Sequence, residues 1–170
     1  MKKMYGWIVC VLSIAALVAP TMAQGNRGKA ELQVSGGTIT VDYGRPSLKG
    51  RDMLSQLQDG MFWRMGMNQS TTFTTPVDLT FGSTKVANGS YSLWLLKTGS
   101  GFQLVFNSQT GQWGTQHDPE KDVHDAAMKT EALSSPAETF TIELKPASGG
   151  GELDLEWGAT KLVAPFTFGK

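Results

Sequence analysis

Cysteine is almost absent from this chain. Its single cysteine, Cys10, lies in an N-terminal segment with the features of an export signal: two lysines, a short apolar run and the small-x-small site Thr21-Met22-Ala23. We therefore expect residues 1–23 to be a signal peptide that is cleaved before Gln24, with an uncleaved N-terminal anchor as the alternative. The mature chain then has no thiol, which excludes disulfides, thiol catalysis and cysteine-ligated metals. The expected location is outside the cytoplasm, periplasmic or extracellular, and the fold must be held by its hydrophobic core.

An excess of charge of either sign is also lacking. The chain has 15 basic and 15 acidic residues, and removal of the two lysines in the signal segment leaves 13 against 15, a net charge near −2. This balance gives no support for nucleic-acid binding or for attachment to a membrane surface. The apolar run near the N-terminus is too short for a good membrane span, so we expect no span in the mature chain. With only two histidines, a three-histidine metal site is impossible, and we expect no cofactor.

What the sequence has in abundance is alternation of apolar and polar residues. The period of two, which is typical of half-buried strands, recurs in segments around residues 32–34, 39–43, 77–81, 91–95, 102–106, 140–144, 153–157 and 162–168. Short strands at hairpin spacing predict an all-β protein, an antiparallel β-sandwich or jelly-roll-like barrel. We expect a flexible lead-in over residues 24–29 and a single β-sandwich domain over residues 30–170.

Several local features make this expectation more specific. Residues 52–60 have an Asp cap, a shared apolar face and a final glycine, which predicts one short helix. Residues 77–107 predict a three-stranded meander. Residues 123–133 are ambiguous between strand and helix, and the all-β surroundings favour a strand. Ser134-Ser135-Pro136 predicts a break, and Pro165 predicts that the last strand lies at an edge or contains a bulge.

The densest polar cluster lies between residues 38 and 74. A strand ends there in Gly44-Arg45-Pro46, and Pro46 restricts the arginine before it to extended geometry. Asp42 is close enough in sequence to brace Arg45, arginine suits carboxylate or phosphate groups, and Trp63 is suited to stack on a ring or a guanidinium. The candidate ligand-binding residues are Asp42, Tyr43, Arg45, Lys49, Arg51, Trp63, Arg64 and Asn68.

Two interpretations of this cluster stay open. In the first, it is a pocket for a small polar ligand, anionic or carbohydrate-like. In the second, an Arg–Asp network ties the first strands and the short helix to the sandwich. The corresponding functions are a binding domain, a hydrolase acting on envelope or polysaccharide material with Asp42 as its acid or base, and a structural or protein-interaction module.

The long loop over residues 107–122 and its exit hold both histidines and several acidic residues. Three of the acidic residues are spaced two apart, as in a calcium loop, but Val123 occupies the position of the required glycine and Lys129 that of the distal glutamate. A solvated acidic loop is therefore favoured over a metal site. No Gly-x-Ser-x-Gly elbow occurs after residue 23, which argues against a serine hydrolase of that type.

Five motifs carry a resemblance to a known family. In chain order they are VDYGRPSLKGR (41–51), FWRMGMNQSTTF (62–73), ANGSYSLW (87–94), FQLVFNSQTGQWG (102–114) and LEWG (155–158). Together they resemble a family of exported bacterial proteins catalogued as domain of unknown function 2911, over essentially all of residues 30–168. The resemblance implies export and an all-β domain, and it implies no particular activity.

Overall fold

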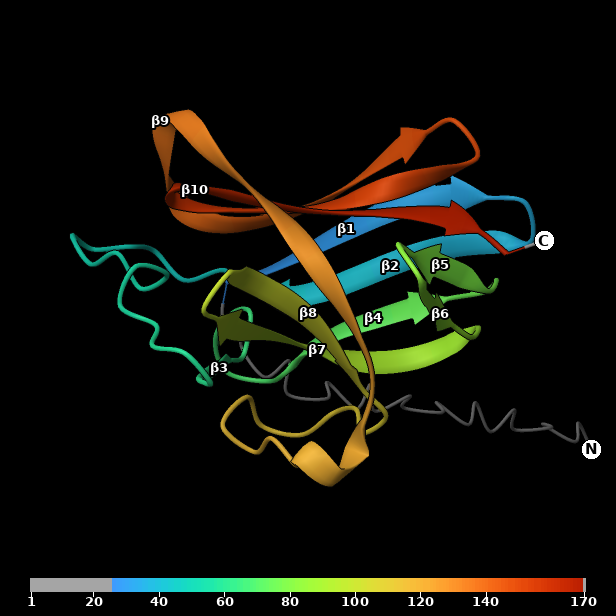
Figure 1. The fold of residues 1–170 in the computed structure, drawn as a ribbon, viewed down its shortest axis with the longest axis horizontal. Coiled ribbons are helices and arrows are strands. Elements are labelled where there is room, and N and C mark those ends of the chain that lie inside the picture. The colour runs from blue at the N-terminus through green and yellow to red at the C-terminus, as the bar shows by residue number, and fades with distance from the viewer. Residues whose placement is uncertain (1–25, 170) are drawn as a thin grey trace, which may run out of the picture.

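The computed structural model describes residues 26–169. The expected signal peptide over residues 1–23 lies outside the described residues. The described chain is almost entirely antiparallel β-structure (Figure 1), so the expected fold class is confirmed. The strands are β1 (Arg27–Val34), β2 (Gly37–Gly44), β3 (Phe62–Trp63), β4 (Thr71–Thr75), β5 (Leu79–Phe81), β6 (Thr84–Val86), β7 (Gly89–Thr98), β8 (Gly101–Asn107), β9 (Asp122–Ala147) and β10 (Gly150–Phe168).

The strands form one continuous sheet that folds over on itself. Its order is β1-β2-β4-β7-β8-β9-β10-β5-β6, with β3 paired to β7. β9 runs from the loop after β8 into the layer that holds β10, so it belongs to both layers (Figure 1). The two layers face each other across the core, where Phe81 of β5 lies 5.2 Å from the ring centre of Phe106 in β8 and 6.4 Å from that of Phe73 in β4. The apolar faces predicted by the alternation therefore meet in a sandwich-like core.

β9 and β10 are long because bulges bend them without ending them. β9 has 26 residues and β10 has 19. Ala132 pairs with Thr160 and Ala137 with Gly158, so residues 133–136 bulge out of the ladder. Gly158 has a φ of +60°, a value that suits glycine at such a point. The expected break at Ser134-Ser135-Pro136 is therefore a bulge inside a continuous strand.

The ambiguous segment and the last proline are explained by the same two strands. Residues 123–133 are strand, as favoured above, and pair with β8 and then with β10. Pro165 lies between Val163, which pairs with Lys129 of β9, and Phe166, which pairs with Phe81 of β5. At this change of partner the ladder does not need the amide proton that proline lacks.

Three local expectations were wrong. Residues 52–60 form turns rather than a helix, because backbone bonds there span three residues and nine residues are too few to sustain an isolated helix. The only helical turn among the described residues is the 3₁₀ helix η1 (Pro119–Lys121). Arg27 already belongs to β1, so the lead-in ends before residue 27 rather than at residue 29. The meander over 77–107 holds only as the β7–β8 hairpin, since β5 pairs with β6 and β10.

The end of β2 connects the two layers. Beyond Gly44 the chain leaves β1 and pairs with β9 through a bond from the Phe140 amide to the Pro46 carbonyl, at 2.9 Å, and another from the Leu48 amide to the Glu138 carbonyl, at 2.8 Å. The sheet order places no strand on the far side of β1. We call the line along which β1 and β9 meet the seam. It begins at the end of β2, where the predicted polar cluster lies. Within residues 26–169, no helix is long and apolar enough to cross a membrane.

Candidate functional site

The structure separates the eight predicted residues into three groups. Tyr43 and Arg45 lie at the seam between β1 and β9 and line an open groove of about 460 Å³. Arg51, Trp63 and Arg64 line a different and smaller pocket. The other predicted residues, which line neither of these cavities, are Asp42, Lys49 and Asn68.

Tyr43 is a structural residue of the seam. Its side chain is buried, and its hydroxyl donates a hydrogen bond of 3.2 Å to the backbone carbonyl of Ile142 in β9. Its ring meets Phe140 edge to face, with ring centres 5.6 Å apart. Gly28 lies directly opposite Tyr43 in the β1–β2 ladder, and a Cβ atom there would stand 2.8 Å from Cζ of the tyrosine. The absence of a side chain at Gly28 thus lets the Tyr43 ring reach across β1 to β9.

Arg45 serves the same seam. Its Nε donates to the carbonyl oxygen of Phe140 at 3.4 Å, and its Nη2 donates to Oγ1 of Thr141 at 3.3 Å. The expected brace from Asp42 is absent, because that carboxylate is ion-paired with Arg27 of β1. Antiparallel pairing explains why Asp42 has Arg27 rather than Arg45 as its partner, since β1 runs beside β2 and brings Arg27 close to Asp42. For Arg45 and Tyr43, the structural interpretation is the one that the contacts support.

Lys49 and Asn68 both occupy turns with positive φ, at +49° and +63°. Lys49 is exposed, and its backbone amide donates to Glu138 Oε1 at 3.2 Å. The carbonyl of Asn68 accepts a bond of 2.8 Å from the Gly114 amide. Both residues therefore shape the backbone around the cluster.

Arg51 and Arg64 both line a pocket of about 230 Å³. Its floor is aromatic: Trp63 stacks on Trp157, with ring centres 5.0 Å apart and planes 17° apart, and Trp63 also meets the edge of Phe140. Trp63 is only 9% exposed, so its ring face is taken by Trp157 and packs against protein. The complete lining is Pro46, Ser47, Leu48, Arg51, Met53, Trp63, Arg64, Gly66, Met67 and Trp157.

The charge of this pocket is uncompensated within the described residues. None of the residues that line it is acidic. Among residues 26–169, neither Arg51 nor Arg64 forms a side-chain hydrogen bond or an ion pair by the usual distance limits. Arg64 is held by packing, because its stem lies against Gly114, where a Cβ atom would stand 2.7 Å from Arg64 Cδ. The pocket therefore presents two positive groups above an apolar floor.

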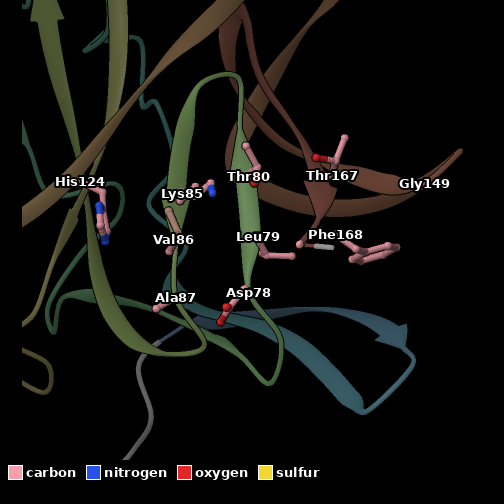
Figure 2. A pocket seen from close by; sticks show the side chains of 11 residues that line it. Asp78, Leu79, Thr80, Lys85, Val86, Ala87, His124, Gly149, Thr167 and Phe168 are labelled. Atoms are coloured by element: carbon pink, nitrogen blue, oxygen red, sulfur yellow. The ribbon is translucent and has the colours of Figure 1, made fainter.

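A larger cavity of about 640 Å³ lies far from this cluster in sequence. It is formed by the β5–β6 hairpin, the beginning of β9 and the end of β10 (Figure 2). Asp78, Lys85 and His124 are the ionisable residues that line it. No local motif in the sequence indicates this cavity, because its lining comes from four separate segments.

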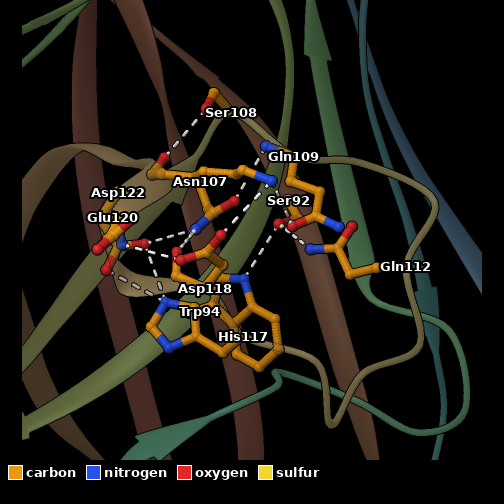
Figure 3. Close-up of polar contacts among 11 residues, drawn as sticks. Ser92, Trp94, Asn107, Ser108, Gln109, Gln112, His117, Asp118, Glu120 and Asp122 are labelled. Atoms are coloured by element: carbon orange, nitrogen blue, oxygen red, sulfur yellow. Dashed lines mark hydrogen bonds and ion pairs between the residues drawn. The ribbon is translucent and has the colours of Figure 1, made fainter.

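The long loop over residues 107–122 packs onto the outer face of β7 and β8 through a polar network (Figure 3). Buried Ser92 accepts hydrogen bonds from Trp94 Nε1 at 3.0 Å and from Gln112 Nε2 at 2.9 Å. The ring of His117 lies between Phe62 and Trp94, with ring centres 4.3 and 4.5 Å away. The loop is thus anchored to the sheet by several specific contacts.

Two of the acidic residues of this loop, Asp118 and Asp122, interact with other residues of the loop and its ends. Asp122 Oδ1 accepts from Asn107 Nδ2 at 2.8 Å and lies 2.9 Å from His117 Nε2. Asp118 caps η1 by accepting from the amide of Glu120. Over the described range 26–169, no group of three or more potential ligands is placed to hold a metal ion.

Comparison with known proteins gives one finding. The family model described as "Protein of unknown function (DUF2911)" matches residues 26–166. The chain belongs to this family. Neither the curated proteins nor the solved structures contain a match. The family resemblance read from the five motifs is therefore confirmed.

Three residues that matter for the site of this DUF2911 protein were not among the predicted ones. Trp157 supplies half of the aromatic floor, and its buried Nε1 has no hydrogen-bond partner among the described residues. Gly28 and Gly114 provide the space for Tyr43 and Arg64. Trp157 belongs to one of the quoted motifs, LEWG, which was the available signal. Gly114 likewise ends a quoted motif, FQLVFNSQTGQWG, whereas Gly28 lies in none of them, and its role is defined by side chains that reach it from β2 and the segment after it.

Proposed function

We propose that this protein binds a small anion, a carboxylate or phosphate group on a compact molecule, in the pocket between Arg51 and Arg64. The observation that supports the proposal is that two arginines line one pocket whose described lining contains no acidic residue. Structural arginines usually have carboxylate or carbonyl partners, as Arg27 and Arg45 do here. Arg51 and Arg64 differ from them in this respect.

The chemistry of the pocket suits such a ligand. A guanidinium offers planar, paired N–H donors that match the oxygens of carboxylate and phosphate. The volume of about 230 Å³ favours a compact ligand or the anionic end of a larger one.

The structure favours the anionic over the carbohydrate-like version of the hypothesis. A bound sugar ring would need an open aromatic face, but the face of Trp63 is covered by Trp157. The hydrolase hypothesis needed Asp42 as an acid or base. That carboxylate is ion-paired with Arg27 and lies outside the arginine pocket.

Calorimetric titration of the mature protein with phosphate and with small mono- and dicarboxylates tests the proposal. The variants are Arg51→Gln and Arg64→Gln, with Lys49→Gln as the matched control, since Lys49 is an exposed cation of the same segment outside the pocket. Each arginine variant should weaken binding about tenfold or more, because a hydrogen bond to a charged group contributes about 1.5–3 kcal/mol.

The control should bind as tightly as the wild type. Equal weakening by Lys49→Gln would show non-specific attraction to surface charge, and the absence of saturable binding to any of these anions would refute the proposal.

We further propose that the protein acts outside the cytoplasm. This rests on the signal features of residues 1–23, which lie outside the described residues. N-terminal sequencing of the natural protein recovered from the envelope or medium should begin at Gln24. Recovery from the cytoplasm with residues 1–23 intact would contradict it.

A further inference from the structure

The floor of the cavity of about 640 Å³ is the outward face of the sheet formed by β10, β5 and β6. Thr80 of β5 pairs with Lys85 of β6 on one side and with Thr167 of β10 on the other. Because paired residues share a face and alternate residues along a strand do too, Asp78 and Ala87 extend the same surface. All five residues line the cavity (Figure 2).

Two opposite charges on this floor do not neutralise each other. Lys85 is exposed, and among residues 26–169 its ammonium group forms no ion pair and no side-chain hydrogen bond. Asp78 uses Oδ1 to accept from the backbone amide of Asn88 at 2.8 Å and from its Nδ2 at 2.9 Å. These hydrogen bonds lower the pKa of the Asp78 carboxyl, which keeps it ionised at neutral pH.

The spacing of the charges is set by the strands. Asp78 directly precedes β5 and lies two residues before Thr80, the partner of Lys85, so the backbones of the two charged residues are offset by about 7 Å along the strand direction. Thr80 and Thr167, which both carry a hydroxyl group, lie level with Lys85 in the sheet rather than with Asp78. A lysine and an aspartate at such a backbone offset suit a ligand whose ammonium and carboxylate groups are attached to the same carbon.

We propose that this cavity is a second binding site, which takes a small zwitterion of the α-amino acid type. The ammonium group of the ligand faces Asp78, and its carboxylate faces Lys85 and the threonine hydroxyls. Its side chain lies toward Ala87, at the Asp78 end of the cavity. This inference is independent of the anion pocket, with which the cavity shares no lining residue.

Titration of the mature protein with L-leucine, N-acetyl-L-leucine and L-leucinamide tests the proposal. The acetyl derivative lacks the ammonium charge and the amide lacks the carboxylate, so both should bind at least about tenfold more weakly than L-leucine. Amide chemical shifts in two-dimensional NMR spectra should change around residues 78–87 and 167–169. Equal binding of the three compounds, or no saturable binding of L-leucine, would overturn the proposal.

Variants then assign the two ends of the ligand. Lys85→Gln should reduce binding of L-leucine about tenfold and leave binding of L-leucinamide unchanged. Asp78→Asn, which keeps an oxygen acceptor for Asn88, should reduce binding of both compounds. The control variants Lys129→Gln, an exposed cation elsewhere on β9, and Arg64→Gln should bind L-leucine as the wild type does. Loss of binding in Arg64→Gln would place the amino acid in the anion pocket and overturn the second site.

Discussion

Replacement of Gly28 by alanine is the sharpest test of how the seam between β1 and β9 is closed. The new Cβ atom would stand 2.6 Å from Arg45 Cδ, 2.8 Å from Tyr43 Cζ and 2.9 Å from the Tyr43 hydroxyl oxygen. These distances are shorter than any relaxed contact, so the tyrosine ring or the strand must shift. A shift of the ring also weakens the bond from its hydroxyl to the Ile142 carbonyl.

Two opposing effects decide how much Gly28→Ala changes the free energy of unfolding. Alanine in place of glycine within a strand is ordinarily favourable by roughly 0.5–1 kcal/mol. Overpacking of a filled site costs about 1–3 kcal/mol, and loss of the Tyr43 hydrogen bond adds about 1 kcal/mol. We therefore expect Gly28→Ala to lower the free energy of unfolding by about 1–3 kcal/mol. Chemical denaturation followed by tryptophan fluorescence measures this difference.

A double-mutant cycle identifies the cause. A Tyr43→Ala background removes the two contacts with the tyrosine and leaves only the one with Arg45 Cδ, part of a flexible side chain that can move, so the loss caused by Gly28→Ala should be much smaller there. Gly99→Ala is the matched control, because its Cβ atom would meet only the end of the Asp59 side chain, at 3.2 Å, and it should change stability by less than about 0.5 kcal/mol. A stabilising effect of Gly28→Ala in the wild type, or the same loss in both backgrounds, would refute the proposed packing.

Three further predictions concern other sites. Gly114→Ala should weaken anion binding without touching the ligand, because its Cβ atom would stand 2.7 Å from both Arg64 Cδ and the Asn68 carbonyl oxygen and would displace them; unchanged affinity by calorimetry would show that Arg64 is positioned otherwise. Asp154 is fully buried, and its Oδ2 accepts from Lys145 at 2.8 Å and Lys161 at 3.1 Å. Lys145→Met and Lys161→Met should each lower the free energy of unfolding by about 1 kcal/mol, but the double variant should lower it by about 3–5 kcal/mol, because it leaves a buried charge unpaired. Additive losses in chemical denaturation would contradict this. The hydrogen bond to Asp154 raises the pKa of Lys145 in the folded state, so its stabilisation is complete below the ordinary lysine pKa of about 10.4 and is lost at higher pH. The free energy of unfolding of Lys145→Met should accordingly fall less at alkaline pH than that of the wild type. A pH profile parallel to that of the wild type would contradict this prediction.

Much of the local structure could be predicted from the sequence. Alternation of apolar and polar residues defines which side chains face the core, because successive residues of a strand point to opposite faces. The strands around Ile39, Leu93, Leu104, Ile142 and Leu155 followed from this pattern and are present. Five motifs were also enough to indicate the family, which the match over residues 26–166 confirms. The buried face of a strand and the motifs of a family can both be read from short stretches of the sequence.

The pairing of strands could not be predicted in the same way. Alternation reports which face is buried but contains no information on the neighbouring strand, so β5 was expected beside β7 and instead pairs with β6 and β10. The serine–serine–proline segment at 134–136 reads as a break, yet the strand continues through a bulge because β10 supports both of its ends.

The division of the polar cluster was decided by tertiary structure alone. Arg45 and Arg64 look equivalent in sequence, as cations near a strand end. Folding places Arg45 against β9, about a hundred residues away in the chain, where carbonyl and hydroxyl oxygens satisfy it. Arg64 instead lines a pocket without acidic residues. The partners of a side chain come from whichever distant segments the sheet brings beside it, and those contacts determine which arginine supports the fold and which is placed to meet a ligand.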